Sequence, residues 1–120
     1  MNLLVHGSAF YTDRDRIWGS LDKVHAKTPI TLLVTTDSRG ACAEAIAWAK
    51  ANKVVPMVVG LTAGAPPGMN GEALYRRQNK RLVEEGQVAG MVAFPGNKHT
   101  HELVDAMKEK SLPVWQPFGR

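Results

Sequence analysis

Three segments of the chain combine small residues with groups that can bind an anion. They span residues 6–10, 36–41 and 95–100, and each lies between an apolar run and an amphipathic stretch. If the apolar runs are strands and the amphipathic stretches are helices, each segment ends at a helix N-terminus. Such a terminus presents free N–H groups and a partial positive charge, which favour phosphate or carboxylate. Since Arg39 and Lys98 add a cation to two segments, the sequence predicts a site for a phosphate-bearing ligand.

Histidines and carboxylates in or near these segments are the candidates for acid–base chemistry. His6, His99 and Glu102 are the candidate catalytic residues, because a histidine side chain titrates near neutral pH. A histidine in such a loop more often contacts a ligand than catalyses. Asp37 can hold a ribose hydroxyl or orient a base. We expect no metal site, because His6, His99 and His101 lack a carboxylate at useful spacing and no Cys/His cluster has zinc spacing.

Three widespread motifs are absent from the sequence. No G-x-G-x-x-G follows the first apolar run, which argues against a standard dinucleotide site. The chain also lacks G-x-x-x-x-G-K-[ST] and G-x-S-x-G, which argues against a P-loop NTPase and an α/β-hydrolase.

The elements that position these segments follow from the alternation of the sequence. Short apolar runs rich in β-branched residues are separated by amphipathic stretches. Continuous apolar strands separated by helices indicate a parallel sheet that is covered on both faces. The sequence therefore predicts one doubly wound, five-stranded α/β domain over residues 1–120. The predicted strands are residues 3–6, 30–35, 54–60, 89–94 and 112–115.

Residues with capping side chains mark the predicted ends of the helices. We expect Thr12, Ser38, Asn70 and Thr100 to be the N-caps of the four helices, and Gly86 to follow the third helix as its C′ residue.

Residues 61–71 are rich in glycine and proline and form a long loop. Because this loop follows the third predicted strand, it lies at the carboxyl edge of the sheet, where open α/β sheets bind ligands. Two interpretations stay open, a lid over a ligand and a tolerated insertion.

Composition and charge bound the class of protein. A chain of 120 residues that is 44% hydrophobic and 22% charged is typical of one globular domain, which excludes a coiled coil and a wholly disordered chain. The net charge of +4 is compatible with a phosphate-bearing partner. The single cysteine, Cys42, cannot form an internal disulfide, and the N-terminus does not read as a signal peptide, so we expect a cytoplasmic protein.

The order of several segments resembles the YspA/YpsA-related SLOG family, whose fold is shared with cytokinin-activating phosphoribohydrolases and DprA. The segments that carry this resemblance are 10–14, 21–22, 30–33, 38–41, 79–86 and 92–100. The resemblance implies a Rossmann-like sheet with strand order 3-2-1-4-5. It also implies a ligand that is a nucleotide or derives from one.

The resemblance and the helix-terminus argument together assign the ligand-binding residues. They are Gly7, Ser8, Phe10, Ser38, Arg39, Gly40, Asn79, Pro95, Gly96, Asn97, Lys98, His99 and Thr100. The sequence departs from the family pattern in these loops, since Asn97 and His99 replace glycines and Cys42 replaces an Asp. Enzymatic relatives place a catalytic Glu at the position of Leu103, so the resemblance does not imply turnover.

The sequence thus favours a small SLOG-type module that binds a nucleotide or nucleotide-derived ligand without strong catalysis and without a required cofactor. A hydrolase of an N-glycosidic or phosphoester bond is the alternative. Nucleic-acid binding through the basic residues 76–81 is a second, weaker alternative. If one of the three tryptophans is exposed, a homodimer is the natural explanation.

Overall fold

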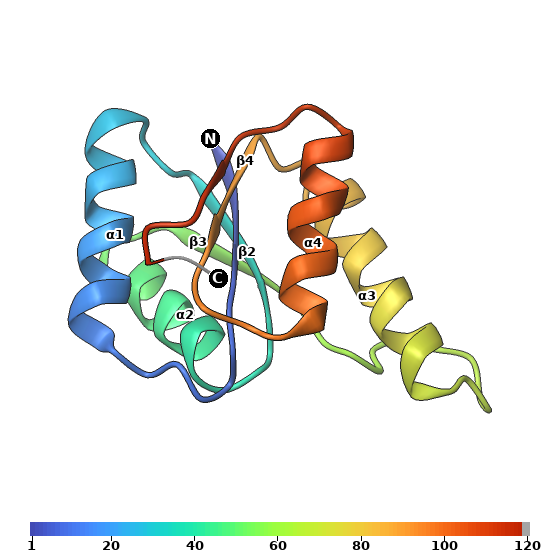
Figure 1. The fold of residues 1–120 in the computed structure, drawn as a ribbon. Helices are drawn as coiled ribbons and strands as arrows, with labels where there is room; N and C mark the ends of the chain where they lie inside the picture. The colour runs from blue at the N-terminus through green and yellow to red at the C-terminus, as the bar shows by residue number, and fades with distance from the viewer. Residues whose placement is uncertain (119–120) are drawn as a thin grey trace.

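The computed structural model describes residues 1–118 and contains a five-stranded parallel sheet (Figure 1). The strand order is β3-β2-β1-β4-β5, which confirms the predicted Rossmann-like α/β fold and its order. The strands are β1 (Asn2–His6), β2 (Leu32–Thr36), β3 (Val55–Val59), β4 (Gly90–Ala93) and β5 (Val114–Trp115).

Four helices cover the two faces of this sheet in pairs (Figure 1). They are α1 (Arg14–Lys27), α2 (Ala41–Ala51), α3 (Gly71–Glu84) and α4 (Lys98–Glu109). One buried cluster joins α1 and α2 to the sheet, and a second cluster joins α3 and α4 to its other face. None of the helices within residues 1–118 is long and apolar enough to span a membrane.

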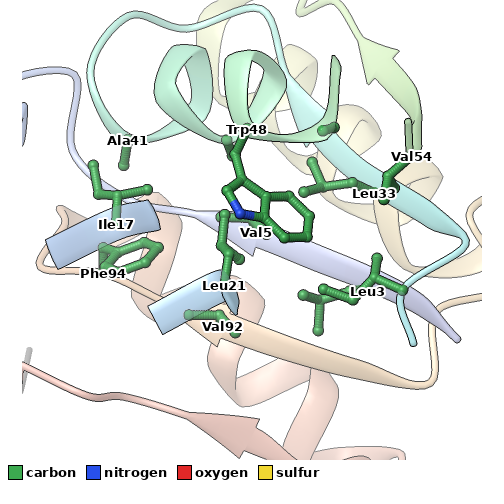
Figure 2. Close-up of a cluster of buried hydrophobic side chains, with 13 residues drawn as sticks. Leu3, Val5, Ile17, Leu21, Leu33, Ala41, Trp48, Val54, Val92 and Phe94 are labelled. Atoms are coloured by element: carbon green, nitrogen blue, oxygen red, sulfur yellow. The ribbon is translucent and has the colours of Figure 1, made fainter. Parts of the chain in front are cut away.

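Trp48 lies at the centre of the first cluster, between α2 and the sheet (Figure 2). Its ring is completely buried, and its Nε1 donates to Asp22 Oδ1 at 2.8 Å. Small residues on the same helix, Ala41, Ala45 and Ala49, are also buried and let α2 approach the sheet closely. Trp48 is therefore a core residue and is not exposed for self-association.

The structure confirms one of the four predicted N-caps. Asn70 caps α3, because its side chain accepts from Ala73 N at 2.9 Å. The expectation for Thr12 is wrong: α1 starts one residue later, and Asp13 accepts from Arg16 N. A carboxylate at this position also interacts favourably with the helix dipole.

The expectations for Ser38 and Thr100 are also wrong. Gly40 precedes α2 without a side-chain cap, because its backbone packs against the loop after β1 and thereby determines where α2 begins. Asn97 caps α4 in place of Thr100, which lies inside the first turn. The Thr100 hydroxyl is instead hydrogen-bonded to a side chain from β1.

Gly86 follows α3 as predicted, but for a reason that differs from the usual left-handed C′ glycine. The residue with positive φ is the next one, Gln87 at 47°. A Cβ on Gly86 would lie 2.5 Å from the carbonyl oxygen of Leu82 and 3.0 Å from the side chain of Val34. Close packing between the end of α3 and β2 therefore requires glycine here.

The Gly/Pro-rich loop lies at the carboxyl edge of the sheet, and its last residue, Gly71, is already the first residue of α3. Two guanidinium groups of α3 bind one carbonyl in this loop: Arg77 Nη1 and Arg81 Nη1 donate to Ala63 O at 2.9 and 3.2 Å. The loop is thus tied to α3. Its function as a lid stays a prediction.

Candidate functional site

A shallow hollow of about 250 Å³ opens at the carboxyl edge, between the loops that follow β1 and β4. These two strands are neighbours, and the chain moves outward from them in opposite directions, so the hollow lies at the topological switch point of the sheet. Ligands of open α/β sheets bind at this position. The hollow, here called the switch-point hollow, is lined by Ser8, Phe10, Tyr11, Pro95 and Gly96.

Backbone hydrogen bonds hold the loop after β1 in a tight turn. Ser8 N donates to Pro95 O at 2.9 Å, which joins this loop to the loop after β4. The Ser8 side chain and carbonyl then accept from Phe10 N and Tyr11 N at 3.0 and 3.1 Å. The turn leaves the Phe10 side chain 93% exposed at the rim of the hollow. An exposed aromatic ring at this position is available for stacking.

Two glycines allow the loops after β1 and β2 to pack against each other. A Cβ on Gly7 would lie 2.8 Å from the Ala41 side chain, and a Cβ on Gly40 would lie 2.5 Å from the Ser8 and Ala9 carbonyls. Gly40 also has a φ of 68°, which side-chain-bearing residues rarely adopt. The contact brings the predicted residues of these two loops together.

The amide groups expected to bind phosphate are partly occupied by the chain itself. At the start of α2, Ala41 N donates to Ser8 O at 3.3 Å. At the start of α4, Asn97 Oδ1 accepts from His99 N at 3.0 Å and from Thr100 N at 3.4 Å. These two helix N-termini therefore offer fewer free donors than the sequence predicted.

The cations of the predicted site differ in their availability. Lys98 Nζ donates to Glu72 Oε1 at 3.1 Å, so part of its charge is neutralised. The pair lowers the pKa of Glu72 and raises the pKa of Lys98 through their mutual hydrogen bond and charge. Arg39 is exposed beside Gly40 and forms no ion pair or side-chain hydrogen bond within residues 1–118. Arg39 is thus the freer of the two cations, although, like Asp37, it does not line the switch-point hollow.

Ser38 and Asp37 are exposed in the same loop as Arg39. Ser38 N donates to Thr36 Oγ1 at 3.2 Å, which stabilises the turn after β2. A Cβ on Gly60 would lie 3.4 Å from Asp37 Oδ2, so Asp37 lies toward the end of β3. Asp37 does not line the hollow.

His6 is buried and does not line the hollow. Its side chain is 7% exposed, and Nδ1 is hydrogen-bonded to Thr100 Oγ1 at 2.8 Å. Burial lowers the pKa of His6 to about 4, and the nearby His99 adds to this effect, so the imidazole is neutral at neutral pH. Thr100 packs directly against Gly96, where a Cβ would overlap the Thr100 side chain. The hydrogen-bonded pair of His6 and Thr100 thus packs against the loop after β4 at Gly96.

His99 lies in the first turn of α4 and stacks on Tyr75 of α3, with ring centroids 3.6 Å apart. Its Nδ1 is 3.9 Å from Glu102 Oε2. Both residues line a small cavity of about 30 Å³ with Arg76 and the Glu72–Lys98 pair. Two candidate catalytic residues are therefore close together, but apart from the switch-point hollow.

Asn79 is not brought to the switch-point hollow. It lines a separate groove of about 420 Å³ between α3 and α4, together with Arg76, Lys80 and Glu102. Its Oδ1 is buried and has no hydrogen-bond partner within residues 1–118. The groove and the hollow share no lining residue. The position of Asn79 therefore separates it from the other predicted ligand contacts.

The basic residues of α3 differ in their contacts. Arg77 and Arg81 are engaged by the Ala63 carbonyl, and Arg81 also pairs with Glu85 at 3.0 Å. Arg76 and Lys80 point into or beside the α3–α4 groove. Within residues 1–118, Arg81 is thus the one residue of this run whose charge is paired, and nucleic-acid binding through the run stays a prediction.

Two aromatic residues were not identified from the sequence, Tyr11 of the hollow and Tyr75 of the small cavity. Tyr11 lines the hollow, stacks on Phe94 at 5.8 Å between centroids, and has a buried hydroxyl without a hydrogen-bond partner in the described chain. The sequence signal that could have identified Tyr11 is its position directly after Phe10. Tyr75 is recognisable only from its contact with His99, which lies on another helix.

No group of three or more metal-ligating side chains converges within residues 1–118.

Comparison with known proteins gives one family match. The model of YAcAr, the YspA, cpYpsA-related SLOG family, matches residues 1–62, which is just over half of the chain. The match covers Ser8, Phe10 and Arg39, whereas the loop after β4 lies outside it. No curated protein and no solved structure shows a significant match.

Proposed function

The chain belongs to the YspA, cpYpsA-related SLOG family, and from this premise we propose that it binds a nucleotide or a nucleotide-derived ligand in the switch-point hollow. The observation that supports this proposal best is the hollow itself. It lies between β1 and β4 and has the exposed Phe10 ring at its rim. Gly40 packs against the loop after β1, and the preceding residue, Arg39, is a cation without an ion pair within residues 1–118. Binding, rather than strong catalysis, is the proposed activity.

Phe10 and Arg39 have complementary roles in this proposal. The Phe10 ring can stack on a nucleobase, an interaction worth about 1–3 kcal/mol per base. Arg39 has five donors in a planar arrangement and can bind a phosphate or carboxylate through two hydrogen bonds. Packing of Gly40 against the Ser8 and Ala9 carbonyls holds the two loops together. Both parts of a nucleotide would therefore meet a suitable group.

Lys98 lines the small cavity beside His99 and not the switch-point hollow, so it would contact phosphate only for a ligand that extends beyond the hollow. Its partner Glu72 is exposed, and an exposed ion pair contributes little stability, so a ligand phosphate can compete for Lys98. The Asn97 side chain would have to move before the α4 amides could take part. Phosphate binding at α4 thus requires rearrangement of the chain.

The environment of the candidate catalytic residues supports binding over turnover. Leu103 is completely buried in the second core cluster, so no carboxylate stands where enzymatic relatives place their catalytic Glu. His6 is buried with its Nδ1 bonded to Thr100. His99 and Glu102 are near each other but outside the hollow.

The proposal is tested by a thermal-shift screen followed by calorimetric titration. The ligands are mono-, di- and cyclic nucleotides, ADP-ribose and NAD. A ligand at 100 times its Kd adds about 2.7 kcal/mol, which raises the Tm of a domain of this size by several degrees. We expect one ligand class to produce this shift. No shift with any of them would contradict the proposal.

Substitutions then locate the site. Phe10→Ala and Arg39→Ala should weaken binding by about fivefold or more and about tenfold or more, respectively, because a base stack contributes about 1–3 kcal/mol and a hydrogen bond to a charged group about 1.5–3 kcal/mol. Val55→Ala and Lys50→Ala are the matched controls, since these side chains are exposed on β3 and on the last turn of α2. Equal affinity in all four variants would place the ligand elsewhere.

Asn79→Ala distinguishes the α3–α4 groove from the switch-point hollow. Binding in the hollow predicts unchanged affinity for this variant, because Asn79 lines only the groove. Chromatography of the same ligand mixtures checks for released base or phosphate. Such release, reduced in Glu102→Gln, would favour the hydrolase instead.

A further inference from the structure

An apolar trough lies on the α1 side of the sheet, beside β5 and away from the switch-point hollow. It consists of two adjoining hollows of about 450 and 250 Å³ that share Lys23, Val24 and Trp115. We call it the α1–β5 trough. Figure 1 shows the red C-terminal segment next to α1, where the trough is formed.

Within the described residues, no helix covers β5 on the α1 face of the sheet, and the trough lies there. The first core cluster takes side chains from β1, β2 and β4 but none from β5, whereas Val114 of β5 packs on the cluster under α3 and α4. Trp115 is therefore left 42% exposed, and Phe118 is 38% exposed. Within residues 1–118, no helix follows β5 to cover them.

One wall of the trough is a regular stripe of α1. Ser20, Lys23, Val24 and Lys27 line it, and their spacing of three and four residues places them on one helix face. The stripe from Ser20 to Lys27 extends about 10 Å along α1, or two turns. A side-chain ridge of this kind packs into the groove of a second helix. The shape therefore fits a helix lying along α1.

The floor and the opposite wall supply apolar anchors. Val92 of β4 lies at the bottom, and Trp115 and Phe118 form the other side. Large aromatic residues in such positions commonly contribute most of the binding energy of an interface. An occupant must therefore present an apolar face to the trough.

The charges at the rim of the trough indicate which residues an occupant should carry beside its apolar face. Lys23 and Lys27 are exposed and form no ion pair within residues 1–118. A partner with carboxylates beside its apolar stripe would complement them. A second copy in a symmetric dimer would instead bring its own Lys23 and Lys27 into the same interface without a complementary charge from the trough, because a two-fold interface pairs identical surfaces.

We propose that the α1–β5 trough binds an acidic amphipathic helix of a partner protein, which completes the helix layer over β4 and β5. The helix lays its apolar residues against Trp115, Phe118 and Val24, and its carboxylates pair with Lys23 and Lys27. This surface is independent of the nucleotide proposal, since it shares no residue with the switch-point hollow.

The test uses two synthetic helical peptides with the same leucine stripe. One carries Glu beside the stripe, and the other carries Lys at the same positions. Fluorescence anisotropy measures binding of each labelled peptide to the full chain. We expect the Glu peptide to bind and the Lys peptide to bind at least tenfold more weakly. Equal binding of both peptides, or no binding of the Glu peptide, overturns the proposal.

Charge reversal on the protein identifies the surface. The double variant Lys23→Glu/Lys27→Glu should bind the Glu peptide with at least tenfold lower affinity than the wild type. It should bind the Lys peptide with higher affinity than the wild type. Lys50→Glu/Lys53→Glu is the matched control, because Lys50 is exposed in the last turn of α2 and Lys53 is exposed two residues after the helix. Equal loss in the two double variants would show a non-specific charge effect and would contradict the proposal.

Sedimentation analysis of the unliganded protein tests the competing occupant. We expect a species whose mass does not change when Trp115 is replaced by Ala. If the wild type is instead a dimer that Trp115→Ala converts to a monomer, a second copy fills the trough and the proposal is wrong. The charge-reversed variant repeats this measurement if Trp115→Ala does not fold.

Discussion

Acidification should destabilise the folded protein through one buried residue, His6. The unfolded chain protonates this imidazole with the ordinary pKa of 6.5, whereas burial lowers the pKa to about 4 in the folded protein. Between these values, the unfolded state binds a proton that the folded state does not. The free energy of unfolding therefore falls as pH decreases from 6.5 toward 4, and the His6 contribution levels off below that.

The size of this effect follows from the difference between the two pKa values. At 1.36 kcal/mol per pKa unit, the loss from pH 7 to pH 4 is about 3 kcal/mol. A typical domain has about 5–15 kcal/mol of unfolding free energy, so one histidine would remove a large share.

Urea unfolding at several pH values, followed by circular dichroism, measures the effect. The variant His6→Asn keeps a polar group near Thr100 but does not titrate in this range. The difference in unfolding free energy between wild type and His6→Asn should shrink by about 3 kcal/mol between pH 7 and pH 4. Carboxylates titrate in both proteins, so their contribution cancels in this difference.

His101→Asn is the matched control, because His101 is exposed on the same helix as Thr100. Its unfolding free energy should follow that of the wild type at every pH. If wild type and His6→Asn show parallel pH curves, His6 is not held in its neutral form, and the reasoning from burial is refuted.

Three further predictions concern the elements that position the site, and each is measured by urea unfolding at neutral pH. Gly40→Ala should lower the free energy of unfolding by at least 1–2 kcal/mol, which is roughly the cost of a left-handed conformation for a residue with a side chain. The control Gly19→Ala should be neutral or stabilising, because a Cβ at Gly19 meets nothing within 4 Å. Asn97→Ala should cost about 1 kcal/mol through loss of the α4 cap, and an unchanged stability would show that the cap hydrogen bonds are not formed. Trp48→Phe should cost about 2 kcal/mol, because it removes buried volume and the hydrogen bond to Asp22; a loss under about 0.5 kcal/mol would contradict the packing seen here.

The fold could be predicted from the sequence because its signals are local. Each strand is a short apolar run with polar or turn-forming neighbours, and each helix has a periodic apolar face. The cap of α3 was also predictable, because Asn70 is a strong cap residue directly before a helical pattern. The strand order came from the family resemblance and not from the pattern of apolar runs.

The other helix starts could not be chosen from sequence, because neighbouring residues compete for the same role. Thr12 and Asp13 are both capping residues, and so are Asn97 and Thr100. The choice depends on where the chain turns after its strand. Close packing of the loop after β1 decides this for α2, where Gly40 meets the Ser8 and Ala9 carbonyls.

By itself, the sequence determined the alternation of strands and helices and placed Ser8, Phe10, Arg39 and Gly96 in loops at one edge of the sheet. Only the tertiary structure decided which of their neighbours stay free to bind a ligand. His6 and Thr100 are 94 residues apart in the chain and bind each other, and Asn79 lies in a different groove. For His6, the physical reason is that a buried polar group is stable when it has a hydrogen-bond partner, and that partner is supplied by proximity in the folded chain rather than in sequence.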